Sequence, residues 1–128
     1  MSCDPDWESI KGTITGFGIQ ESHRKTQGYD FYDEVLVITT DLGSWKFWAE
    51  GDCCAEAYID KDSLPKSEEV VGQKIVKAWV GETTSISDAS FSVKDTNFYY
   101  LETESDEIVV TLYVEHNGYY GGWLRLLK

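Results

Sequence analysis

Apolar and polar residues alternate along most of this chain, and this period of two limits the fold more than any other feature of the sequence. Residues 34–40, for example, place Val35, Val37 and Thr39 on one face of an extended chain. Alternation of this kind indicates a strand with one buried face, because successive side chains point to opposite sides. Helical periodicity is almost absent. We therefore expect a chain made mostly of short β-strands.

Turn-forming residues separate these segments at short intervals. Strands are predicted over residues 10–19, 34–40, 45–49, 74–82, 91–94, 98–102, 107–115 and 119–127. The polar stretch 20–30 is predicted to be a loop, residues 54–60 a strand or a short helix, and residues 63–71 one short helical turn. Turns at 105–106 and 116–118 predict that the last three strands form a meander.

The length of 128 residues fits one domain, and no linker or repeat divides it, so residues 1–128 are predicted to form a single β-rich domain. Many short strands with little helix indicate an all-β (mostly β) fold. We expect an antiparallel β-sandwich or small open barrel with at most one short helix. Several hydrophobic strands would need a covered edge, and an exposed aromatic edge can support a homodimer.

Acidic side chains outnumber basic ones by 23 to 11, which gives a net charge of −12. This balance argues against direct binding of nucleic acid, whose phosphates need basic groups, and against an anionic membrane surface. No apolar run approaches the ~20 residues of a membrane-spanning helix, and the first residues do not resemble a signal peptide. We expect a cytoplasmic protein. Its acidity either serves solubility alone or selects a partner with a basic surface.

The cysteines indicate reduced thiols, because a disulfide between the adjacent Cys53 and Cys54 would be strained. Asp52, Cys53, Cys54 and Glu56 could supply metal ligands, but adjacent ligands diverge in direction and zinc needs four at workable spacing. Acidic neighbours also disfavour a reactive thiolate. The simpler interpretation is that one cysteine packs inward while Asp52 caps a turn. We expect no metal and no cofactor.

No group of residues indicates an enzyme. His23 and His116 lie in separate polar stretches, His116 in a predicted exposed turn, and no local nucleophile motif accompanies them. The glycine-rich stretches lack the strand–turn–helix context and the Lys-Ser/Thr of phosphate-binding loops. With 23 carboxylates, chance pairs say nothing about acid–base catalysis. A non-catalytic protein is therefore predicted.

A group of carboxylates is the first candidate for contact with a partner. Glu102, Glu104, Asp106 and Glu107 surround a predicted hairpin turn. The group is either a solvated tip or a negative patch that binds a basic protein in place of phosphates. We select these four residues as predicted contacts.

Aromatic residues are the second candidate, because they are too numerous for all of them to be buried. Alternation places Tyr99 on the face opposite to Phe98 and Tyr100, and Tyr119 opposite to Tyr120. A sandwich interior accounts for some of the rings, and the others would form a contact or stacking surface. We select Tyr99 and Tyr119 as exposed contacts.

Three stretches resemble an uncharacterised family of phage and bacterial domains. They are Gly-Asp-Cys-Cys-Ala-Glu-Ala-Tyr at 51–58, Val-Gly-Gln-Lys-Ile at 71–75 and Asn-Gly-Tyr-Tyr, the late hairpin, at 117–120. The resemblance spans residues 35–127, and it marks as family motif Asp52, Cys53, Cys54, Glu56, Asn117, Gly118 and Tyr120.

This chain departs from that family's pattern at two places. Many members carry His and Gln just before the Asp-Cys-Cys element, where this chain has Ala49, Glu50 and Gly51. Many also place Glu directly after the second cysteine, where this chain has Ala55. The departures weaken any metal or thiol role. The resemblance implies a phage or prophage setting, hence the host cytoplasm, and it implies no known activity.

These observations predict a non-catalytic acidic binding protein, phage- or prophage-encoded, that docks on a basic surface of a host protein. An inhibitor of host defence or a nucleic-acid mimic acting on a nucleic-acid-handling protein is the expected kind, by analogy with other small acidic phage domains. The alternative is a small-molecule or nucleotide-binding protein with an aromatic-lined pocket anchored by His116, Asn117 and Arg125. It ranks second because the chain has few basic residues for an anionic ligand.

Overall fold

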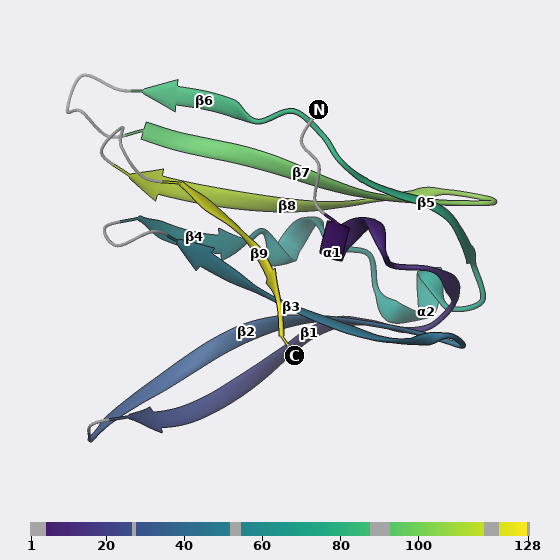
Figure 1. Cartoon of the computed structure of the whole chain (residues 1–128), viewed down its shortest axis with the longest axis horizontal. Helices are drawn as coiled ribbons and strands as arrows, with labels where there is room; N and C mark the ends of the chain where they lie inside the picture. The colour runs from purple at the N-terminus through teal and green to yellow at the C-terminus, as the bar shows by residue number, and fades with distance from the viewer. Residues whose placement is uncertain (1–4, 27, 52–54, 88–92, 117–120, 128) are drawn as a thin grey trace.

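The computed structural model describes residues 5–26, 28–51, 55–87, 93–116 and 121–127 (Figure 1). The strands in it are β1 (Gly12–Thr26), β2 (Tyr29–Thr40), β3 (Gly43–Gly51), β4 (Glu56–Ile59), β5 (Lys74–Val80), β6 (Thr84–Ser87), β7 (Val93–Thr103), β8 (Glu107–His116) and β9 (Gly122–Leu126). The helical segments are α1 (Pro5–Glu8), η1 (Lys61–Ser63) and α2 (Ser67–Val70). The predicted mostly β, antiparallel, open fold is confirmed.

The strands form one sheet in the order β4-β8-β7-β5-β1-β2-β3-β9, with β6 paired to β7, and the sheet does not close into a barrel. One narrow joint divides it, because the β1–β5 ladder consists of the pairs Gly12–Ile75 and Thr13–Lys74. Two backbone bonds of Ile14, with Gln73 at 2.9 Å and with Gly72 at 2.8 Å, extend it. We call the strands on either side the β8 half-sheet (β4, β5, β6, β7, β8) and the β2 half-sheet (β1, β2, β3, β9). Figure 1 shows the two half-sheets facing each other.

The joint depends on a glycine. Gly12 has φ of 107°, a left-handed conformation that side chains disfavour. A Cβ added there would lie 2.5 Å from Asp41 Oδ1, the atom that accepts the N–H of Thr13 at 2.8 Å. The start of β1, where it pairs with β5, can therefore keep this conformation and the Asp41 contact only with glycine at this position.

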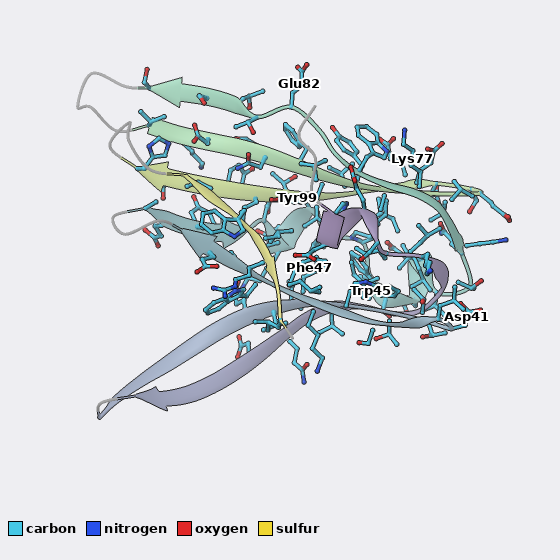
Figure 2. All side chains as sticks on the ribbon, in the orientation of Figure 1. Asp41, Trp45, Phe47, Lys77, Glu82 and Tyr99 are labelled. Atoms are coloured by element: carbon cyan, nitrogen blue, oxygen red, sulfur yellow. The ribbon has the colours of Figure 1, made fainter. Side chains whose placement is uncertain are left out.

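The core lies between the half-sheets, and a residue from the N-terminal helix sits in it. Trp7 is fully buried, and its Nε1 donates a hydrogen bond to the carbonyl of Tyr100 at 3.0 Å. Its ring lies 5.2 Å from the Phe47 ring on β3 and 5.1 Å from the Tyr99 ring on β7. Figure 2 shows Phe47 and Tyr99 beside α1. Trp7 thus joins both half-sheets through aromatic packing.

Several predicted boundaries are wrong. The predicted loop 20–30 lies mostly in β1 and β2, which continue as a paired arm that projects beyond the core (Figure 1). Because the arm lies outside the core, its sequence is polar and lacks the alternation that predicts a strand. Residues 91–94 and 98–102 were predicted as two strands, but the described chain is continuous strand from Val93 to Thr103. The predicted final meander is also wrong, because β9 pairs with β3 instead of β8.

Other predictions are confirmed. Residues 54–60 contain a strand, β4, and the predicted helical turn corresponds to α2. The turn at 105–106 joins β7 to β8, and the strand predicted over 74–82 is β5. The additional helical turn α1 was not predicted. Within the described residues, none of the helices is long and apolar enough to span a membrane.

Candidate protein-contact surface

The four predicted carboxylates, Glu102, Glu104, Asp106 and Glu107, are all exposed at the turn between β7 and β8, and we call them the acidic tip. Buried Thr103 holds this turn. Its N–H donates to the carbonyl of Asp106 at 2.8 Å, and its Oγ1 accepts the N–H of Asp106 at 2.9 Å. The prediction of an exposed acidic hairpin is confirmed, and its contact with a partner stays a prediction.

The side chain of Gln73 fastens the acidic tip to α2. Its Nε2 donates to Asp106 Oδ2 at 3.1 Å and to the carbonyl of Glu69 at 3.0 Å, while its Oε1 accepts from Thr103 Oγ1 at 2.5 Å. Because α2 carries exposed Glu68 and Glu69, this bridge adds their charge to that of the tip.

Lysines lie near the tip on both sides, Lys74 and Lys77 on β5 and Lys66 at the start of α2. Lys77 of β5 is opposite Glu102, and the carbonyl of Lys74 accepts the N–H of Glu104 at 3.2 Å. On the β8 side, Glu69, Asp106 and Glu107 line one open groove. The backbone N–H of Lys66 donates to the Glu69 carboxylate at 3.2 Å, and the carboxylates of the groove outnumber this lysine.

That groove, which we call the β8 groove, has a volume of about 520 Å³. Its lining combines an apolar floor with three carboxylates, and the residues are Ser63, Leu64, Pro65, Glu69, Val70, Asp106, Glu107, Ile108 and Val109. No basic residue is among them. The sequence did not predict this groove. The groove lies between the η1–α2 segment and the start of β8, and these two segments are more than 35 residues apart in the sequence.

The predicted exposure of Tyr99 is wrong. Tyr99 is only 4% exposed; its ring packs on Trp7 and its hydroxyl accepts the N–H of Leu124 at 3.1 Å. Alternation separated Tyr99 correctly from Phe98 and Tyr100, which are partly exposed on the opposite face. The error was the choice of the buried face, which period two alone does not decide.

The outer surface of the β8 half-sheet carries a group of partly exposed aromatic rings, and exposed Trp123 lies on β9 of the other half-sheet. Tyr100 stacks on Trp79 with centroids 4.0 Å apart and planes at 11°, and Phe98 lies 6.4 Å from Tyr100. Farther along, the rings of Tyr58 and Tyr113 are 5.5 Å apart. We call these five residues the outer aromatic face.

A lysine covers part of that face. Lys94 Nζ lies 4.2 Å from the ring centroid of Tyr113 and 5.9 Å from that of Tyr58. A hydrogen bond with Tyr58 raises the pKa of Lys94 above its ordinary value. Lys77 Nζ likewise lies 5.8 Å from the ring centroid of Trp79. Both groups of rings thus contact a lysine of the protein, and the Trp79–Tyr100 stack is the group nearer the acidic tip.

The polar anchors of the alternative small-molecule pocket do not converge. His116 was predicted in an exposed turn, but it ends β8 with a side chain only 7% exposed, and its Nε2 lies 2.7 Å from Asp95 Oδ2. Arg125 is on β9 in the other half-sheet, where its Nη1 contacts the Glu50 carboxylate at 3.0 and 3.1 Å. Asn117 lies outside the described residues.

Most of the predicted family motif also lies outside the described residues. This applies to Asp52, Cys53, Cys54, Asn117, Gly118 and Tyr120, and to the predicted contact Tyr119. Glu56 begins β4, is exposed, and is opposite Glu115 of β8. In the part of the chain that the structure describes, no three His, Cys, Asp or Glu side chains are grouped as a metal site.

Comparison with known proteins gives one family. A model of a domain of unknown function, DUF7448, matches residues 27–126, most of the stretch over which the family resemblance was recognised. No curated protein and no solved structure matches the chain. The chain belongs to the DUF7448 family.

Proposed function

We propose that this protein is a non-catalytic acidic binding protein, encoded by a phage or prophage, that docks on a basic surface of a host protein. The observation that carries the proposal is the acidic tip, a rigid and exposed group of carboxylates beside accessible aromatic rings. The phage setting rests on the family resemblance of the sequence alone.

Charge supports this assignment. With a net charge of −12, the protein is attracted to basic surfaces and repelled by phosphates. Complementary charge accelerates encounter and excludes wrong partners more than it adds affinity. The tip is held by Thr103 and Gln73, so little conformational freedom is lost when it binds.

The aromatic rings supply the second half of a binding surface. Trp and Tyr are the residues that most often contribute large binding energies at interfaces. Trp79 is on β5 directly opposite Tyr100 of β7, which is two positions along the strand from Glu102. A partner that contacts the acidic tip can therefore also contact the stacked rings of Trp79 and Tyr100. The carboxylates of the tip would occupy the partner's basic surface in place of phosphates.

Capture of proteins from host lysate at low and high salt tests this function. We expect a basic, nucleic-acid-handling protein to bind at low salt and to release at high salt, because exposed charges are screened. The variant Glu104→Lys/Glu107→Lys should lose that protein, and Glu21→Lys/Glu82→Lys, with the same charge change at exposed positions elsewhere, should keep it.

Two results would contradict the proposal. One is affinity for the captured protein that stays flat between low and high salt. The other is equal loss in both double variants, which would show that net charge alone matters. Thermal stabilisation of the protein by a nucleotide would instead favour the small-molecule alternative.

A further inference from the structure

One edge of β8 is open over the first half of the strand. β4 pairs with residues 112–115 of β8 and ends at Ile59, and one further bond joins the N–H of Asp60 to the carbonyl of Thr111 at 2.9 Å. Among the residues that the structure describes, no strand pairs with residues 107–110 on that side.

The direction of the peptide groups follows from the bonds at either end. Backbone groups of successive strand residues point to opposite edges. The Thr111 carbonyl points toward β4, and the Asp106 carbonyl points toward β7, where it accepts the N–H of Thr103. The N–H and C=O of Glu107 and Val109 therefore point to the open edge, which has the arrangement that an added strand requires.

The β8 groove runs beside this edge. Val70 and Ile108, each 3% exposed, contribute to its floor, and Leu64 packs against the core. Glu69, Asp106 and Glu107 supply negative charge. The Gln73 bridge fixes α2 relative to the tip, so the walls of the groove are set before a ligand arrives.

We propose that the open edge of β8 and the β8 groove accept an extended basic segment of the partner protein. The segment adds as a strand beside Glu107 and Val109, and it places an arginine or lysine side chain among the three carboxylates. Main-chain bonds would give affinity and the charged groove would give specificity. This inference rests on the proposed function and specifies how the partner is held.

The size and charge of the site define the segment further. Four open residues span roughly 13 Å at about 3.3 Å per residue, which suits three or four residues of ligand. The methylene groups of a long basic side chain can pack on Pro65 and Leu64 while its charged end meets the carboxylates. A second copy of this chain is disfavoured, since each copy carries a net charge of −12.

The test screens the full chain against a bead-bound library of random heptapeptides. We expect the bound peptides to be enriched in Arg or Lys beside β-branched residues. Glu107→Gln should weaken the best peptide roughly tenfold, as expected for loss of a charged hydrogen bond. Glu115→Gln should leave it unchanged, although Glu115 is on the same strand and face, roughly 27 Å away at about 3.4 Å per residue.

Strand addition is tested separately from charge. Val109→Pro removes an N–H at the open edge, where proline is tolerated, and should weaken the peptide at least tenfold. If that variant does not fold, the best peptide is methylated in turn at each backbone nitrogen, and methylation at one or two alternate positions should weaken binding to the same extent.

Each remaining outcome overturns the inference. One is no enrichment of basic peptides. Another is enriched peptides that bind equally well after methylation, which would mean that charge alone attracts them. If the host protein is still captured in a salt-dependent way in either case, the proposed function stands and only this binding mode fails.

Discussion

The two ends of the β7–β8 hairpin are made of the same two strands but differ in how their charged side chains are paired. At the His116 end, Lys94 is opposite Glu115 and His116 contacts Asp95. At the tip, Glu102 is opposite Glu107. Opposite charges across a strand pair are stabilising and like charges are destabilising, each by a fraction of a kcal/mol. The His116 end also holds a like-charge pair, Glu56 opposite Glu115, and the tip an attractive pair, Lys77 opposite Glu102. The ends therefore differ in balance: attractive contacts prevail at the His116 end, whereas the tip gathers four exposed carboxylates whose repulsion a basic partner would relieve.

Both ends of the hairpin share the core around Trp7. Removal of the Trp7 side chain should therefore reduce the stability of both ends, and this is the largest effect that we expect. Trp7→Ala should destabilise the fold by about 3–5 kcal/mol, the usual cost of deleting a large buried ring. Urea denaturation measures the change. Trp123→Ala is the matched control, because Trp123 is 40% exposed, and it should cost much less. If Trp7→Ala unfolded one end of the hairpin while the other end stayed folded, the idea of a shared core would be contradicted.

The stability of the His116 end can be tested at Asp95. Asp95→Ala removes the acceptor of His116 and of Ser85, whose hydroxyl donates to Asp95 Oδ1 at 2.5 Å. It should destabilise the fold by about 1–3 kcal/mol, because the largely buried ring of His116 loses a polar partner. Asp62→Ala, at an exposed position of η1, is the control for urea denaturation. A change below about 0.5 kcal/mol would show that this end is not held by the pair.

The smallest expected effect has the opposite sign. Glu107→Gln should raise stability by roughly 0.2–1 kcal/mol, because it removes repulsion with Glu102. Glu115→Gln should change stability less, because the loss of attraction to Lys94 is offset by relief of the repulsion with Glu56. Thermal unfolding at low salt compares the two, and the difference should shrink as salt is added. Equal shifts of the unfolding temperature in both variants would show that the two ends do not differ in this way.

The sequence pattern predicted fold class better than it predicted which surface is exposed. Period two correctly separated Tyr99 from Phe98 and Tyr100, but it could not decide which side faces the core. That choice depends on Trp7, which arrives from α1, far away in sequence. The pairing of β9 with β3 is another long-range outcome that local turn residues do not encode.

The candidate site was predicted in part for the same reason. The acidic tip is local, formed by residues within one hairpin, and composition with turn chemistry was enough to find it. The β8 groove is not local, since Pro65 and Val109 meet only after the sheet has formed. The open edge of β8 depends on where β4 ends, at Ile59, which alternation alone does not show.

The narrow joint at Gly12 also has a consequence for the order of folding. β1, β2 and β3 follow one another with short turns, as do β7 and β8, so each group can form from neighbouring residues. Pairing of Gly12 with Ile75 must instead close a loop of more than 60 residues for two ladder pairs and the two backbone bonds of Ile14. We therefore expect the two half-sheets to form early and to join late, with the final step governed by chain topology.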